Sequence, residues 1–414
     1  MTVSKAAHTA SVLLAMALAI AGCTPIVDGH AHRDRGFSVD SAIPGVLRPG
    51  NYPTTPSPPF GTADQEGRNG TVIEAQRLAG YVVGPWEVDP TLLHAVATET
   101  YALKNAKALS GLLPDPVQFL AERHHFVLGF SSDRTTSIES GGQATSGAKG
   151  LTNSVWEFAS PEDARAAADD ISQQPPPASL YPNGSVSPHS IPGYPQARAR
   201  AGTLTDGTST VESFTRHGNY LIYNYSRIQK GDSDEAAELI ARILDLQLPR
   251  LDEFPATEPA QFGSLPVDSS GVLQRTLPVS RENLTIQNGV FEPRAALHFQ
   301  GDPVASAKLF TDTGMQAQGV GDAAAVYQTP DAAAAKTLFD GLTRDITADA
   351  DFIPFPPANG LPSTTVCSDK SKTDPLSLYQ CLLTAGRYVA VVLATHPEEL
   401  RQKSAAQYLM LTAP

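Results

Sequence analysis

A strand that continues directly into a helix is predicted at two places in the chain. The first is Val155-Trp-Glu-Phe-Ala-Ser-Pro-Glu-Asp-Ala-Arg-Ala-Ala-Ala168 and the second is Val326-Tyr-Gln-Thr-Pro-Asp-Ala-Ala-Ala-Ala335. In both segments an apolar run is followed by a hydroxyl residue, a proline, an acid and a series of alanines. A hydroxyl can cap the free amides of a helix, a proline fits its first turn, and an acid favours its positive end. We therefore expect the hydroxyls of Ser160 and Thr329 to cap two equivalent helices.

A second pair of segments repeats at nearly the same interval. A turn followed by a strand is predicted by His217-Gly-Asn-Tyr-Leu-Ile-Tyr-Asn-Tyr225 and by Ala385-Gly-Arg-Tyr-Val-Ala-Val-Val-Leu393. The interval between the glycines of this pair differs by a single position from the interval between the prolines of the first pair. Two segments displaced by almost the same distance indicate an internal duplication.

The repeated unit predicts an α+β fold with two homologous repeats. Each copy ends in an amphipathic helix, which begins near Asp232 in the first copy and near Pro397 in the second. The order is strand, helix, two or three antiparallel strands, helix, and we expect the helices to pack on one face of each antiparallel sheet. The polar segment 251–259 contains two prolines and is the predicted boundary between a first repeat domain, residues 70–255, and a second, residues 256–414.

The amino-terminal segment predicts where the protein is located. Residues 1–22 contain one lysine and an apolar run, Val12–Ile20, that is too short to span a bilayer, and small residues precede Cys23. This pattern indicates a signal peptide with a lipobox, and an ordinary signal peptide followed by an incidental cysteine is the alternative. Lipidation with diacylglycerol and palmitate would make Cys23 a stable membrane anchor, because it would carry more than one acyl chain. We expect the chain to be attached to the extracytoplasmic face of the cell membrane.

An extended tether is expected after the anchor. Residues 23–69 contain seven prolines between positions 25 and 59 and lack periodic apolar spacing. We therefore expect a flexible tether that holds the folded part away from the bilayer, with folding beginning near residue 70.

The predicted export also bears on the state of the two remaining cysteines. Cys367 and Cys381 are 14 positions apart. In an oxidising compartment such a pair predicts a disulfide rather than a metal or redox site, and two buried free thiols are the alternative. The corresponding positions of the first copy, one repeat interval earlier, are Ala199 and Ser213, so the bridge would belong to the second copy only. In each copy these positions flank a predicted hairpin, which would bring the two side chains within bonding distance.

Charge and motifs argue against several classes of function. The chain has 30 Lys and Arg against 43 Asp and Glu, a net charge of -13, so we expect no nucleic-acid partner. The sequence lacks His-Glu-x-x-His, a phosphate-binding loop and a Gly-x-Ser-x-Gly elbow. His30 and His32 are too few to form a specific metal site, and we expect His124 and His125 to lie on a strand edge with their rings on opposite faces. We predict no metal, cofactor or catalytic residue, while a dispersed Ser-His-Asp triad stays open.

Tyr223 and Tyr225 are the candidate ligand-binding residues. They are two positions apart on a predicted strand, so they share one face and could line a groove for an apolar or sugar ligand. Ordinary packing of tyrosines on a sheet is the alternative. Because clefts between domains are common ligand sites, we expect this groove between the two repeats.

Three further segments carry a resemblance to a known group of proteins. They are Gly50-Asn-Tyr-Pro-Thr-Thr-Pro56, Glu74-Ala-Gln-Arg-Leu-Ala-Gly-Tyr81 and Gly84-Pro-Trp-Glu-Val-Asp-Pro90. Together with the lipobox and the duplicated unit, they make the chain similar to a family of uncharacterised lipoproteins from mycobacteria and related actinobacteria. The resemblance implies a cell-envelope lipoprotein and supplies no catalytic residues.

These observations favour a non-enzymatic cell-envelope lipoprotein that binds an envelope lipid, a glycan or a protein. A hydrolase of envelope polymers with a dispersed catalytic site is one alternative, and it requires a histidine beside a nucleophile or carboxylate in one pocket. A structural spacer without any pocket is the other.

Overall fold

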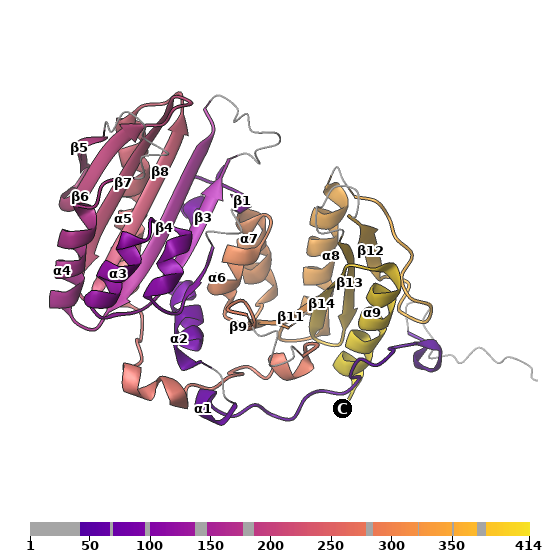
Figure 1. Cartoon of the computed structure of the whole chain (residues 1–414). Helices are drawn as coiled ribbons and strands as arrows, with labels where there is room; N and C mark the ends of the chain where they lie inside the picture. The colour runs from indigo at the N-terminus through magenta and orange to yellow at the C-terminus, as the bar shows by residue number, and fades with distance from the viewer. Residues whose placement is uncertain are drawn as a thin grey trace, which may run out of the picture. The chain divides into compact units, whose positions relative to one another are not determined.

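Two antiparallel sheets and the helices around them make up the folded part of the chain (Figure 1). The computed structural model describes residues 42–66, 69–95, 100–136, 147–176, 186–278, 285–321, 323–349, 352–370 and 378–414. Cys23, His30 and His32 lie outside the described residues, so the predicted signal peptide and lipid anchor stay predictions.

The first sheet has eight strands, which belong to the first repeat. Its order is β1-β3-β4-β8-β7-β6-β5, and the short strand β2 also pairs with β3. The strands are β1 (His94–Ala95), β2 (Tyr101–Leu103), β3 (Phe126–Thr135), β4 (Lys149–Phe158), β5 (Val186–Ile191), β6 (Tyr194–Thr203), β7 (Thr208–His217) and β8 (Tyr220–Gln229). All neighbouring strands are antiparallel.

The second sheet has six antiparallel strands in the order β12-β13-β14-β11-β10-β9. The strands are β9 (Gly289–Phe291), β10 (Ala317–Val320), β11 (Ala324–Gln328), β12 (Val366–Asp369), β13 (Tyr379–Ala385) and β14 (Tyr388–Ala394). The run β10-β11-β14-β13-β12 has the same connectivity as β3-β4-β8-β7-β6 in the first sheet. The predicted duplication is therefore confirmed. It begins earlier than the repeated sequence segments, because the preceding strand, β3 in the first repeat and β10 in the second, is also equivalent.

The turns that join the last two strands are also equivalent. Gly218 and Gly386 each begin a two-residue turn, and each has a φ of 56°. A positive φ at the first turn position favours glycine, which has no Cβ to clash with the backbone. The glycines that revealed the duplication are therefore required by the turns.

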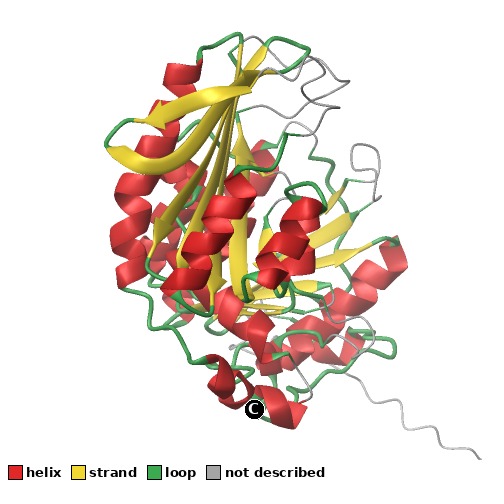
Figure 2. Cartoon of the chain, turned by 60° about the vertical axis from the view of Figure 1, so that its left-hand side comes forward, coloured by secondary structure: helices red, strands yellow, loops and turns green. Residues whose placement is uncertain are grey.

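Helices cover both faces of each sheet, which differs from the predicted arrangement on one face (Figures 1 and 2). In the first repeat, Trp156 and Leu221 pack with α3 (Pro116–Arg123) and α4 (Pro161–Ser172). Their chain neighbours Val155 and Ile222 point to the other face and pack with α2 (Gly70–Leu78) and α5 (Ser233–Asp252). Continuous apolar runs such as residues 220–223 are typical of strands buried on both faces.

The second repeat is covered in the same way. Leu382 and Val389 belong to the cluster that contains α8 (Ala332–Ala348), whereas Leu383 and Ala390 belong to the cluster that contains α9 (Pro397–Thr412). Two shorter helices, α6 (Pro293–Ala296) and α7 (Pro303–Thr313), precede β10. α8 is thus the counterpart of α4, and α9 is the counterpart of α5.

The start of α8 corrects one of the predicted helix caps. Ser160 caps α4 by accepting a hydrogen bond from the Asp163 amide, as expected. α8 is instead capped by Asp331, whose carboxylate accepts from the Ala334 amide at 2.9 Å. Thr329 lies two residues before this cap, and its hydroxyl donates to the Arg387 carbonyl. The true counterparts are Ser160 and Asp331, because Asp can replace Ser at a helix N-cap.

Residues 42–66 pack against the second repeat, whereas we expected a flexible tether in this part of the chain. Leu47 is buried in a cluster with Leu361 and Ala405 of the second repeat. The Ile43 amide donates to the Gly360 carbonyl at 2.8 Å, and α1 (Ala63–Glu66) precedes α2. The prolines permit an extended path along the second repeat, and burial of the apolar residues holds the segment against it.

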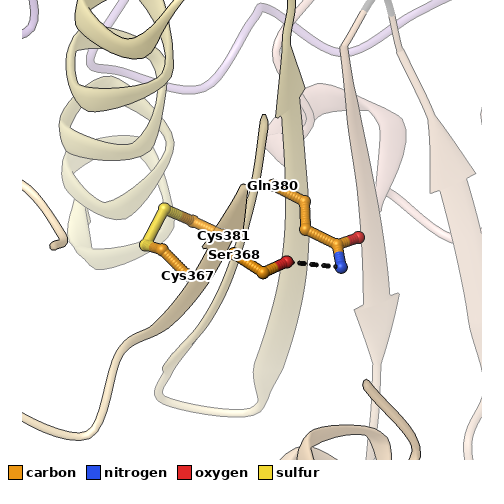
Figure 3. The surroundings of a disulfide bond; sticks show 4 residues. All are labelled: Cys367, Ser368, Gln380 and Cys381. Carbon is orange, nitrogen blue, oxygen red and sulfur yellow. Dashed lines mark hydrogen bonds between the residues drawn. A yellow bond between two sulfur atoms is a disulfide. The ribbon is translucent and has the colours of Figure 1, made fainter. Parts of the chain in front are cut away.

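Cys367 and Cys381 form a disulfide, as predicted (Figure 3). They are direct cross-strand partners on β12 and β13. Ala199 and Ser213 occupy the same paired position on β6 and β7. The duplication therefore placed the bridge correctly, and only the second repeat carries it.

Candidate ligand-binding site

The α4 face of the first sheet is covered only in part. Strands β4, β6, β7 and β8 have 10 residues each, and at 3.3 Å per residue they are about 33 Å long. α4 has 12 residues and is about 18 Å long, whereas α5 on the opposite face has 20 residues and is about 30 Å long. A large part of the sheet therefore extends beyond the end of α4.

The sequence after α4 explains why this helix is short. α4 ends at Ser172, and its C-cap residue is Gln173. Residues 175–177 are three consecutive prolines. Proline lacks the amide that a helix needs and disfavours helical backbone in the residue before it, so the helix cannot continue through this run.

A cavity of about 250 Å³ lies over the part of the sheet beyond the end of α4. Its apolar wall comes from Leu112, Leu113 and Pro114, which precede α3, and from Pro176. Its polar wall consists of side chains on the strands, chiefly Thr152, Arg200, Glu212, Tyr223, Tyr225 and Arg227. The cavity thus combines an apolar rim with a polar floor, which is typical of small-molecule sites.

One ion pair in the floor joins β6 to β7. Arg200 and Glu212 are direct cross-strand partners, and the guanidinium contacts the carboxylate. Arg200 also donates to the Gln174 carbonyl just after α4. Burial raises the pKa of Glu212, and the nearby Arg200 and the Tyr223 hydroxyl oppose this effect by favouring the charged form.

A second ion pair joins β8 to β3. The Arg227 Nη2 atom lies 3.2 Å from both carboxylate oxygens of Asp133, which is fully buried. The Thr152 hydroxyl donates to the same carboxylate. The Arg227 guanidinium is 5.7 Å from the centre of the Tyr225 ring. A Cβ at Gly150 would lie 2.6 Å from Arg227 Nε, so this glycine leaves the space that the guanidinium fills.

The two predicted tyrosines share one strand face and line the same cavity. The Tyr223 ring is buried and packs against Trp156 and Phe214, with ring centres 5.5 and 5.3 Å away. Tyr225 is half-buried. Tyr223 therefore serves the packing of the sheet as well as the cavity wall, and Tyr225 is the more accessible of the two.

The cavity lies within the first repeat, whereas we expected the groove that contains these tyrosines between the repeats. A separate groove of about 690 Å³ does lie at the junction, where it is lined by residues that include Tyr81, Arg294, Phe310 and Met315. Neither Tyr223 nor Tyr225 contributes to it. The position of the tyrosines follows from the short α4 helix and could not be inferred from the domain boundary.

The adjacent histidines 124 and 125 do not lie on a strand, in contrast to the prediction. His124 is the C-cap residue of α3, and His125 has a left-handed φ of 56° in the turn before β3. Ring nitrogens of His124 and His125 lie 2.8 and 2.9 Å from carboxylate oxygens of Asp170 and Asp163 on α4. These histidines therefore connect α3 to α4.

His298 is buried at the junction of the repeats. Its ring nitrogens lie 2.9 Å from the Ser132 hydroxyl and 3.0 Å from the Ala79 carbonyl, and burial lowers its pKa to about 4. Arg134, also buried, donates to the carbonyl of His298 at 2.6 Å and packs over Trp86. Enclosed contacts of this kind are structural, because substrate would have no access to the Ser132 and His298 pair.

Histidines and clusters of metal-ligating side chains are not found at the cavities of the described residues. No histidine lines any of the cavities described for these residues. Within the same ranges, no group of three or more His, Cys, Asp and Glu side chains could hold a metal ion. The helices of the described segments are also too short or too polar to cross a membrane. Because it contains both predicted tyrosines and the Arg200 and Glu212 ion pair, the cavity over the first sheet is the candidate site.

Comparison with known proteins assigns the two repeats to adjacent family models. The N-terminal model of a domain of unknown function, DUF7373, matches residues 61–267, and its C-terminal model matches residues 272–413. Among solved structures, the extracellular domain of PknH from Mycobacterium tuberculosis is similar at 11% sequence identity and a TM-score of 0.25, over 35% of this chain and 75% of that one. This structural likeness is too slight to support an inference. No curated protein matches the chain.

Proposed function

This chain belongs to the DUF7373 family, and from that premise we propose that it is a non-enzymatic lipoprotein of the cell envelope whose first repeat binds one small ligand. The family description states no activity, so the proposal rests on the residues of this chain. A ligand-binding role is favoured over a spacer because the first repeat contains a cavity that a spacer does not need.

The single observation that carries the proposal is the cavity over the part of the sheet that α4 leaves uncovered. Its floor brings together a half-buried tyrosine, the ion pair of Arg200 with Glu212, and Arg227, whose partner Asp133 is fully buried and does not itself line the cavity. Placing charged pairs in a partly buried floor costs desolvation, and apolar side chains could fill this face instead. A ligand site is the simplest reason for a polar cavity at this place.

The envelope location is supported by the sequence before the fold and by the disulfide after it. The lipobox at Cys23 indicates a lipid anchor. The bond between Cys367 and Cys381 is typical of proteins that leave the reducing cytosol. The mycobacterial or actinobacterial envelope suggested by the sequence resemblance is part of this proposal.

Binding can be tested with native mass spectrometry and thermal shift of the full chain against a library of sugars, polyols, organic acids, amines and apolar fragments. We expect at least one compound to bind with one-to-one stoichiometry and to raise Tm. Leu204, which lines the cavity, is the site for a blocking variant, Leu204→Trp. The matched control is Leu246→Trp at an exposed leucine of α5 on the opposite face.

The proposal requires that Leu204→Trp loses the ligand while Leu246→Trp retains it. A ligand that binds both variants equally would show that the binding site is not this cavity. A library that yields no ligand for the unmodified chain would contradict the binding function.

The anchor is tested separately by intact-mass analysis of the protein from its native host. We expect a mass increase equal to diacylglycerol plus any further acyl chain on Cys23, and we expect Cys23→Ser to leave the membrane fraction. A chain without an acyl adduct would contradict the proposed attachment.

A further inference from the structure

The charges in the floor of the cavity are already balanced. Two guanidinium groups face two carboxylates, and each ion pair is formed between strands of the first sheet. A ligand with a net charge would have to compete with one member of a pair. The partner left behind, such as the fully buried Asp133, would then lack its counter-charge in a poorly solvated place.

The polar groups of the wall provide both donors and acceptors. A guanidinium only donates hydrogen bonds and a charged carboxylate only accepts them, while the hydroxyls of Thr152 and Tyr223 donate to Asp133 and Glu212 and keep lone pairs that can accept. Ligand hydroxyl groups match such a mixed surface, because each hydroxyl donates and accepts at once. A carboxylate could pair only with the donors of this surface, and an ammonium group only with its acceptors.

The size and remaining surface of the cavity restrict the ligand further. A volume of about 250 Å³ is smaller than the roughly 300–1,000 Å³ of sites for drug-sized ligands, so it suits one ring rather than an extended chain. Leu112, Leu113 and Pro114 face the same space and would contact the apolar C–H groups of a ring. These properties describe a compact molecule with polar edges and apolar faces.

We propose that the first repeat binds an uncharged, polyhydroxylated ring of the monosaccharide class between its ion-paired floor and its apolar rim. This inference rests on the proposed ligand-binding function and specifies the ligand for the same site.

A charge series on one ring tests the proposal. Glucose, galactose, mannose and myo-inositol provide neutral polyhydroxylated rings, glucuronate adds a negative charge, glucosamine adds a positive charge, and benzyl alcohol provides an apolar ring with one hydroxyl. Binding of each probe to the full chain is measured by saturation-transfer NMR at pH 7. We expect at least one neutral ring to bind at least tenfold more tightly than both charged rings and benzyl alcohol.

A double variant tests the role of the charged floor. Arg200→Ser with Glu212→Gln introduces the neutral pair that the second repeat has at the same position, where the Gln380 amide donates to the Ser368 hydroxyl at 2.9 Å (Figure 3). This variant keeps a cross-strand hydrogen bond, so we expect it to fold with an unchanged circular dichroism spectrum and to bind the neutral ring at least tenfold more weakly. Leu246→Trp is expected to bind like the unmodified protein.

The outcomes separate this inference from the proposed function. Equal or tighter binding of glucuronate or glucosamine, including tighter glucuronate binding as the pH falls and Glu212 is protonated, would overturn the inference and leave a ligand site. Binding of benzyl alcohol alone would also overturn it. If no probe binds, the inference fails, whereas the proposed function fails only if the broad library also gives no ligand that Leu204→Trp blocks.

Discussion

The two repeats share one strand order and differ in how far a helix covers the sheet. In the first repeat α4 is about 18 Å long on strands of about 33 Å. In the second repeat α8 has 17 residues and is about 26 Å long, on strands β13 and β14 of seven residues and about 23 Å. The helix α8 is thus as long as the strands beneath it, whereas α4 is shorter than its strands, and the cavity lies where α4 ends.

The side chains at equivalent positions follow this difference. The pair Arg200 and Glu212 in the first sheet corresponds to Ser368 and Gln380 in the second. Tyr225 is the sixth residue of β8, and its counterpart at the sixth position of β14 is Leu393. Charges and a tyrosine accompany the open face, while neutral and apolar residues accompany the covered face. The comparison teaches that the duplication preserves the strand order, and that the length of the helix on the sheet determines where a ligand can enter.

The largest expected effect comes from breaking the ion pair that distinguishes the first repeat. Arg200→Ser leaves Glu212 without its partner in a largely buried place, and we expect it to lower the free energy of unfolding by about 4 kcal/mol. The double variant Arg200→Ser with Glu212→Gln should lower it by only about 1 kcal/mol, because a neutral hydrogen bond replaces the pair. Urea unfolding measures both values. Equal losses in the single and double variants would contradict the importance of the unpaired charge.

The disulfide distinguishes the second repeat and is expected to have the next largest effect. Replacing both Cys367 and Cys381 by alanine frees a loop with a sequence separation of 14, and we expect a loss of about 3 kcal/mol. The corresponding change in the first repeat, Ser213→Ala at a position that already pairs with Ala199, removes no bridge and is the control. Urea unfolding under non-reducing conditions should show the difference. A cysteine-free protein as stable as the parent would refute this prediction.

A buried carboxyl group, Glu157, gives the first repeat a pH dependence that the neutral Gln328 at the equivalent position of the second repeat cannot give. Burial, together with the negative charge of Glu74, raises the pKa of Glu157 from 4.5 to about 7 in the folded protein. Because the pKa is higher in the folded protein than in the unfolded chain, the contribution of Glu157 to stability is fully present below pH 4.5. This contribution is lost as the pH rises through 7. We expect the free energy of unfolding to fall by about 2 kcal/mol between pH 5 and 8 because of this group.

The matched variant is Glu157→Gln, since Gln328 occupies the equivalent position opposite Tyr388, as Glu157 lies opposite Tyr220. The difference in stability between the parent and Glu157→Gln should change with pH in the stated direction. A difference that is constant from pH 5 to 8 would show that Glu157 has an ordinary pKa.

The smallest effect concerns the two equivalent helix caps. Ser160→Ala and Asp331→Ala should each lower the free energy of unfolding by about 1 kcal/mol, because each removes the acceptor for an amide in the first turn. Thermal unfolding can resolve changes of this size. Variants that leave Tm unchanged would show that Ser160 and Asp331 do not stabilise their helices as caps.

The sequence was sufficient to predict features that depend on local signals. The strand-to-helix segments, the Gly218 and Gly386 turns and the partners of the disulfide all follow from a repeat with a nearly constant interval. The shared face of Tyr223 and Tyr225 follows from the alternation of side chains along a strand.

Other features depend on information that single segments do not contain. Arg200 contacts Glu212 because of the β6 to β7 register, and Arg227 on β8 reaches Asp133 on β3 across the intervening strand β4. The helices on both faces were missed although the apolar run at 220–223 indicates them. The proline run 175–177 prevents α4 from continuing, but the effect on the sheet depends also on the length of the strands beneath the helix.

The central claim is that the open face of the first repeat, and not the covered face of the second, is the ligand site. Amide-resolved NMR titration of the deuterated full chain with the tightest compound from the binding screen tests it most directly. The account predicts saturating shift changes at Thr152, Glu212 and Tyr225 with one-to-one stoichiometry, and unchanged amides on β13 and β14. Shift changes concentrated on the second sheet would contradict it.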